Sequence, residues 1–153
     1  MAANEKDMLM KADHVKVYFK GKNKRSGTVK AVDDISFEIM RGETFGVVGE
    51  SGCGKSTLGR TLIRLLKPTD GHIYLEGQDI ATLKGAELKQ MRKKAQIIFQ
   101  DPYSSLDPRM TVYDLIGEGL LAHKLVSSRT ELEERVEAVM EKCGLFPEQA
   151  LRF

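Results

Sequence analysis

Eight residues in the first half of the chain have the types and the spacing of a phosphate-binding loop. They begin at Gly49, end at Ser56 and spell Gly-Glu-Ser-Gly-Cys-Gly-Lys-Ser, which fits the pattern G-x-x-x-x-G-K-[ST] at every fixed position. Glycines let the backbone turn tightly enough for its N–H groups to point at a phosphate, and the positive end of a following helix attracts the negative charge of that phosphate. The sequence therefore predicts that the chain binds a nucleoside triphosphate.

Each residue of this loop has an expected role. Lys55 is expected to reach the β- and γ-phosphate oxygens, and the Ser56 hydroxyl to ligate Mg²⁺, so the predicted cofactors are ATP and Mg²⁺. The remaining nucleotide contacts are expected from Gly49, Glu50, Ser51, Gly52, Cys53, Gly54 and Thr57. Cys53 lies where a helix N-terminus favours a reactive thiolate, although a small filler residue is the simpler interpretation.

The elements that must position this loop can be predicted from hydrophobic periodicity. Apolar residues alternate with polar ones over 15–19 and 35–39, which indicates two antiparallel strands. The apolar run 45–48 predicts a buried strand leading into the loop, and 56–66 predicts an amphipathic helix after it. A short strand is expected at 73–75.

The second half of the chain begins with a strand and continues with helices. Residues 86–93 have the pattern of an exposed basic helix, and 95–99 form a compact apolar run typical of a strand. Proline and turn residues make 100–109 a loop. Thr111 can cap one helix, and the capping box 128–131 starts a second, whose apolar stripe is expected to be core and which ends at Gly144.

Composition limits the class of protein. The chain is 41% hydrophobic and 30% charged, which is typical of a soluble globular protein rather than a disordered one. Its first seven residues carry charges of both signs and form no long apolar run, so no signal peptide is expected, and no apolar run in the chain approaches the length of a membrane span. We expect a cytoplasmic location, peripheral on the cytoplasmic face of the membrane. The two cysteines are far apart and are expected to be free thiols.

The segment 16–30 is rich in lysine and contains no acidic residue. Such a segment can contact phosphates or anionic lipid heads. It also contains glycine, asparagine and serine, which favour a hairpin loop with solvated lysines, and this is the preferred interpretation.

Longer segments resemble a known family. Residues 49–58 together with 98–110 closely resemble the ATPase subunits that power oligopeptide and dipeptide import in the ATP-binding cassette (ABC) transporters, and 31–37 and 68–71 are similar to them too. The resemblance covers about residues 8–153. It implies an α/β fold with the P-loop core of an ABC ATPase and an N-terminal antiparallel β portion over about 8–110. The start of the helical subdomain is then expected over about 111–153.

The resemblance also implies roles for two residues outside the loop. Tyr18 matches the aromatic residue that stacks on adenine in this family, with the adjacent Phe19 as the alternative; a strand aromatic is otherwise more often core. Gln100 is similar to the glutamine that reaches Mg²⁺ and the attacking water, and that senses the membrane subunits. Without the surrounding motif it would be a plain polar strand end.

The family pattern is only half present. Neither the signature segment, nor the Walker B strand with its aspartate and glutamate, nor the switch histidine occurs in these residues. The sequence thus resembles the first half of a subunit with its C-terminal half missing, and the chain alone is expected to be inactive or nearly so. The partners implied are permease subunits, a second ATPase subunit and an extracytoplasmic peptide-binding protein. Two alternatives stay open: a non-hydrolysing nucleotide-binding fragment, and a non-transport ABC ATPase acting on nucleic acid, which only the lysine-rich segment supports.

Overall fold

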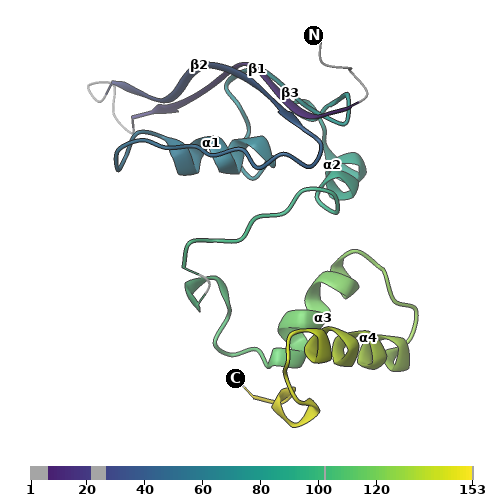
Figure 1. The fold of residues 1–153 in the computed structure, drawn as a ribbon. Coiled ribbons are helices and arrows are strands. Elements are labelled where there is room, and N and C mark those ends of the chain that lie inside the picture. The colour runs from purple at the N-terminus through teal and green to yellow at the C-terminus, as the bar shows by residue number, and fades with distance from the viewer. Residues whose placement is uncertain (1–6, 22–26, 102, 153) are drawn as a thin grey trace. The chain divides into compact units, whose positions relative to one another are not determined.

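The computed structural model describes residues 7–21, 27–101 and 103–152 (Figure 1). The chain divides into two units, one ending at Ile97 and the other beginning at Ile98. The first unit holds all the described strands and the phosphate-loop motif, and the second holds a pair of helices. Among the described helices, none combines the length and the apolar character that crossing a bilayer requires.

The first unit is built on an antiparallel sheet with the strand order β2-β1-β3-β4. The strands are β1 (Met8–Lys20), β2 (Thr28–Met40), β3 (Asp70–Leu75) and β4 (Gln78–Asp79). β1 pairs with β2 along nearly its whole length, in a register that places Val15 opposite Ile35. The alternating segments of the sequence therefore form the predicted antiparallel strands, and the strand expected at 73–75 is confirmed within β3.

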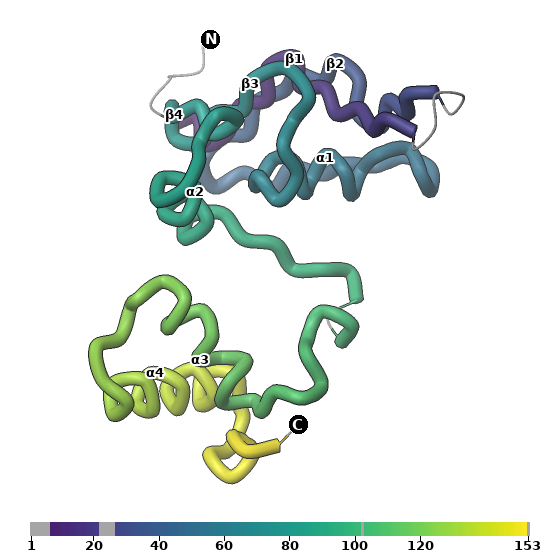
Figure 2. The backbone as a smooth tube through the Cα atoms, turned by 180° about the vertical axis from the view of Figure 1, so that it is seen from behind, coloured from purple at the N-terminus to yellow at the C-terminus, as the bar shows by residue number. Residues whose placement is uncertain are grey.

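Helix α1 (Lys55–Leu62) runs along one face of this sheet, as both backbone views show (Figures 1 and 2). Leu58 of α1 packs in one buried cluster with Val15 and Ile73 of the sheet, and α2 (Gly85–Met91) contributes Met91 to the same cluster. The buried residues of β1 and β3 mostly alternate with residues that are only partly buried, so the period of two in the sequence supplies the core face of the sheet.

Helix α1 is shorter than its predicted span of 56–66. Arg64 adopts a left-handed backbone conformation with φ 57°, which ends the helical path. Its buried guanidinium donates hydrogen bonds to the carbonyls of Ile80 at 2.7 Å and Leu83 at 3.1 Å. These bonds tie the end of α1 to the segment between β4 and α2, an interaction that helical periodicity does not reveal.

Two predicted strands do not form. Residues 45–48 and 95–99 have no strand assignment, and Val48 and Ile98 are 93% and 94% exposed. A strand requires a neighbour that takes up its N–H and C=O groups, and no strand in the described part of the chain pairs with either segment. The first segment keeps one aromatic contact, a stack of Phe45 on Phe37 with ring centroids 4.8 Å apart.

The second unit contains α3 (Val112–Ala122) and α4 (Arg129–Lys142), with 3₁₀ turns η2 (Tyr103–Ser105) and η3 (Pro147–Gln149). The two helices share a small core of Leu132, Val136 and Met140 packed against α3. At Gly117 of α3 an added Cβ would meet Leu132 at 3.3 Å, so the small residue allows close packing of the pair.

The predicted helix caps are confirmed with one adjustment. Thr111 and Asp114 form a complete capping box at the start of α3. Ser128 caps α4 by accepting from the Glu131 amide at 3.1 Å, but the Glu131 carboxylate accepts from Ser127 rather than from Ser128. The stripe of α4 is only partly core, because Val139 is 40% exposed and Cys143 is exposed too.

Candidate nucleotide-binding site

The phosphate-loop motif is held against the sheet at its last glycine. Gly54 is the N-cap of α1 and has φ 101°, a conformation that residues with a side chain rarely adopt. A Cβ at this position would lie 2.1 Å from the carbonyl oxygen of Ala31 on β2. Only glycine therefore lets the start of α1 approach β2 so closely, which gives this fixed position of the motif a steric cause.

Lys55 folds back onto the loop that precedes it. Its Nζ donates to the carbonyl oxygens of Gly49 at 2.7 Å and Glu50 at 2.6 Å, and it lies 3.6 Å from Cys53 Sγ. An ammonium group has three N–H donors, so these three contacts use all of them. A phosphate that engages Lys55 must replace at least one, and the lysine both closes the loop and offers the charge.

The N-terminus of α1 suits an anion. The first turn contains no acidic side chain, and Gly54 offers no side-chain cap to the free N–H groups. Phosphate oxygens are the acceptors that this positive end lacks. Ser56 lies exposed in the same turn, where its hydroxyl can face a Mg²⁺ ion held by the phosphates.

Among the described residues no three His, Cys, Asp or Glu side chains are grouped so as to hold an ion. Nucleotide-bound Mg²⁺ usually keeps several waters and binds the substrate phosphates together with one or two protein side chains.

A hollow of about 340 Å³ lies beside the loop. The loop side consists of Cys53, Gly54 and Lys55, and β2 forms the opposite wall with Lys30, Ala31, Val32, Asp33 and Ile35. The exposed residues Val47 and Val48 complete the lining together with Leu58. The hollow thus joins the phosphate loop to the first half of β2.

Tyr18 lies beside this wall. In the register of the sheet it is opposite Lys30, and its hydroxyl donates a hydrogen bond to Asp33. The Lys30 ammonium lies 5.2 Å from the centre of the Tyr18 ring and 3.1 Å from Asp33 Oδ2. Lys30 and Asp33, which contact Tyr18, also line the hollow beside the phosphate loop. The contacts of Tyr18 therefore lie next to the loop. Phe19, the alternative platform, is 44% exposed and pairs with Val29.

The side chains of Tyr18, Lys30 and Asp33 shift one another's pKa values. The hydrogen bond to Asp33 raises the pKa of Tyr18. Hydrogen bonds from Tyr18 and Lys30 lower the pKa of Asp33, and Asp33 in turn raises the pKa of Lys30. At neutral pH the cluster therefore consists of a neutral phenol, a carboxylate and an ammonium ion.

Sequence reasoning found Tyr18 but missed its two partners. Lys30 and Asp33 are three positions apart, so regular alternation would place them on opposite faces of β2. The pairing is irregular here: Val17 lies opposite Val32 and Tyr18 opposite Lys30, which leaves one extra residue on β2. This β-bulge reverses the alternation and brings both side chains to Tyr18. The sequence carries no signal for it.

Gln100 belongs to the second unit, where it is exposed. The residues after it form a loop with its own hydrogen bonds: the Ser104 amide donates to Asp101 Oδ1 at 3.3 Å, and the Ser105 hydroxyl donates to the Asp101 carbonyl at 2.9 Å. The role of Gln100 toward Mg²⁺ and water stays a prediction.

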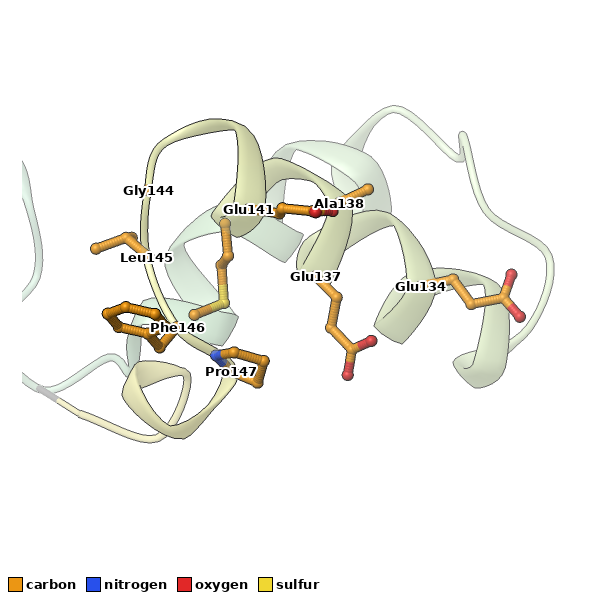
Figure 3. Close-up of a pocket in the computed structure, with 9 residues that line it drawn as sticks. Glu134, Glu137, Ala138, Glu141, Gly144, Leu145, Phe146 and Pro147 are labelled. Atoms are coloured by element: carbon orange, nitrogen blue, oxygen red, sulfur yellow. The ribbon is translucent and has the colours of Figure 1, made fainter.

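A larger hollow of about 670 Å³ lies in the second unit beside α4 (Figure 3). Its charged lining consists of Glu134, Glu137 and Glu141, and the remainder is largely apolar, with Met140, Leu145, Phe146 and Pro147. Carboxylates repel phosphates, so its size does not make this hollow a nucleotide site.

Comparison with known proteins identifies the family. Residues 32–152 match the family described as ABC transporter. The chain belongs to the ABC transporter family. It is 49% identical, over 96% of its length, to the oligopeptide transport ATP-binding protein OppF of Bacillus subtilis (strain 168), and 47% identical over 99% to AppF of the same organism. It spans 48% and 47% of these relatives, which is about half of their length.

Solved structures support the same family. The dimeric ATP-binding cassette MJ0796 in a post-hydrolysis state bound to ADP and Pi superimposes with a TM-score of 0.75 at 25% identity, over 94% of this chain and 61% of that one. The structure of cbiO1 from Clostridium perfringens, part of the ABC transporter complex cbiONQ, superimposes with a TM-score of 0.67 at 27% identity, over 94% of this chain and 53% of that one. The predicted resemblance and the ABC ATPase fold are thereby confirmed, and family membership implies nucleotide binding.

Proposed function

We propose that this chain is the nucleotide-binding part of an ATPase subunit that powers ABC-type import of oligopeptides or dipeptides. The phosphate loop carries the proposal. Gly54 brings α1 against β2, the first turn of α1 has no acid, and Lys55 lies within the curve of the loop. These features form a cradle for the β- and γ-phosphates of Mg²⁺-ATP.

The proposed roles follow from the chemistry of each group. Lys55 neutralises charge on the phosphoryl oxygens, and backbone N–H groups from Gly49 through Thr57 bind the phosphates. Ser56 ligates Mg²⁺, which neutralises phosphate charge when bound. Tyr18 stacks on adenine, and Gln100 positions the attacking water and contacts the metal.

The proposed domain division and partners come from the family resemblance. The β portion and core extend over about 8–110, and the helical subdomain starts at about 111. The relatives are named transport ATP-binding proteins, which supports permease subunits as partners and a place on the cytoplasmic face of the membrane. The dimeric state of the solved cassette MJ0796 supports a second ATPase subunit. An extracytoplasmic binding protein would deliver the peptide.

Calorimetric titration with three ligands tests the phosphate cradle. Mg²⁺-ATP and Mg²⁺-tripolyphosphate should both bind, because both present β- and γ-phosphates to the loop. AMP should bind at least about tenfold more weakly than ATP, since it lacks them. Equal affinity for ATP and AMP would place the binding energy on the nucleoside and contradict a phosphate-loop site.

A further inference from the structure

We propose that Asp33 and Lys30 are positioning residues for the base of the bound nucleotide. Asp33 fixes the Tyr18 ring through its hydroxyl, and Lys30 covers one face of the ring, so that the base stacks on the opposite face. This inference rests on the proposed function, because it concerns the same site. It adds two residues of β2 to that site and states what each does.

Tyr18 is held at its backbone and at the tip of its side chain. At its backbone, the Tyr18 amide donates to the Thr69 hydroxyl at 2.8 Å. At its far end, the phenol donates to Asp33, which is three positions from Lys30 on β2. The backbone bond fixes where the side chain starts, and the bond at the hydroxyl restricts the χ1 torsion, one of the two torsions that a tyrosine side chain has. A ring ordered before the base arrives loses less conformational freedom on binding, which raises the affinity.

Lys30 selects the face of the ring. Its ammonium lies 5.2 Å from the ring centre, within the range of a cation–π contact. Its ion pair with Asp33 at 3.1 Å keeps it there. A flat base cannot stack where the ammonium lies, so it takes the other face.

The ion pair with Asp33 gives Lys30 a different role from that of Lys55. Lys30 lines the hollow together with Lys55, and a free lysine there would be a phosphate ligand. Paired with Asp33 and placed over Tyr18, Lys30 acts on the base instead. Its loss must then weaken binding of ATP and leave binding of tripolyphosphate, which has no base, unchanged.

A double-mutant cycle with two ligands tests this. Asp33→Ala and Tyr18→Phe each remove one partner of the same hydrogen bond, so each should weaken Mg²⁺-ATP binding about threefold, and Asp33→Ala somewhat more because it also releases Lys30. The double variant should be no weaker than Asp33→Ala alone, because the shared bond can be lost only once. Affinity for Mg²⁺-tripolyphosphate should not fall in any of the three. Asp33→Asn, which retains an acceptor for the phenol, should be milder than Asp33→Ala.

Lys30→Met tests the second residue against a matched control. It keeps an apolar stem of similar length and removes the charge, and it should weaken ATP binding about twofold to threefold with no loss for tripolyphosphate. Lys11→Met is the control, since Lys11 lies on the neighbouring strand and pairs with Glu38 at 3.6 Å. It removes the same charge and one exposed ion pair, and it should change neither affinity.

The outcomes that overturn the inference differ from those that overturn the proposed function. Additive losses in the cycle, or equal losses for ATP and tripolyphosphate, would show that Asp33 acts through charge or folding and not through Tyr18. If Asp33→Ala does not stay folded, unchanged ATP affinity in Tyr18→Phe refutes the positioning role by itself. Failure of the unmodified protein to bind either ligand would instead refute the phosphate cradle.

Discussion

Two kinds of apolar segment in the first unit behave differently. β1 and β3 pair with their neighbours and bury Val15 and Ile73 completely, whereas 45–48, directly before the phosphate loop, pairs with no strand among the described residues and leaves Val48 93% exposed. Both are apolar enough to be strands. A strand therefore forms where a partner edge is available, and β1, β2 and β3 supply such edges to one another.

The phosphate loop is therefore held mainly at its C-terminal end, where α1 begins, rather than by the segment that precedes it. Its leading segment contributes one aromatic stack, while its end is fixed by Gly54 against Ala31 and by Leu58 in the buried cluster. The stability of the loop should therefore depend on the contact between α1 and β2 far more than on residues 45–48.

Gly54→Ala should have the largest effect. The new methyl group would overlap the Ala31 carbonyl and force a strained φ, so we expect a loss of at least about 3 kcal/mol in stability of the first unit together with loss of ATP binding. Gly59→Ala is the control, because Gly59 lies within α1 with open space around it. It should stabilise by about 0.5–1 kcal/mol. Urea unfolding of both variants checks this, and equal effects would contradict the anchoring of the loop at β2.

Val15→Ala and Val48→Ala compare the two segments directly. Val15 is fully buried and should cost about 2 kcal/mol when truncated, through lost burial and a cavity. Val48 is 93% exposed and should cost less than about 0.5 kcal/mol. The urea midpoints of the two variants provide the measurement. A large loss at Val48 would show that 45–48 is paired in solution.

Tyr18→Trp gives a smaller effect and a direct signal. The protein contains no tryptophan, so the substitution introduces a single fluorophore at the proposed base platform. Stacking needs an aromatic face but the hydroxyl that bonds Asp33 is lost, so ATP affinity should fall no more than the roughly threefold expected of Tyr18→Phe, and ATP but not tripolyphosphate should quench the emission. Tyr18→Ala should weaken ATP binding by about 1 kcal/mol. A loss at Phe19→Ala without one at Tyr18→Ala would move the platform by one residue.

The sequence predicts the parts of this structure that rest on local signals. The alternation of apolar and polar residues predicts β1 and β2, and the capping residue Thr111 predicts the start of α3. The fixed positions of the motif locate the loop from Gly49 to Ser56. Prediction from the sequence failed where the outcome depends on distant backbone. Residues 45–48 and 95–99 lack a described pairing edge, and Arg64 ends α1 by reaching carbonyls beyond β4.

The candidate site shows the same limit. The fixed positions of the phosphate-loop motif lie within eight consecutive residues, so a pattern suffices to find them. Lys30 and Asp33 both reach Tyr18 only because a bulge in β2 reverses the alternation of its side chains between the two faces of the sheet. No residue type in the sequence indicates that bulge. Gln100 was assigned from the motif around it, and its role remains a prediction.

Calorimetric titration of Mg²⁺-ATP into the unmodified protein and into Lys55→Ala tests the central claim, that this loop binds the phosphates of a nucleotide. Removing the ammonium should weaken binding at least about tenfold, or about 1.4 kcal/mol, because it removes a charge at the phosphates and opens the loop at Gly49 and Glu50. Lys67→Ala, which removes an exposed charge beyond the end of α1, should leave the affinity unchanged. Equal affinities of the unmodified protein and Lys55→Ala would contradict the claim.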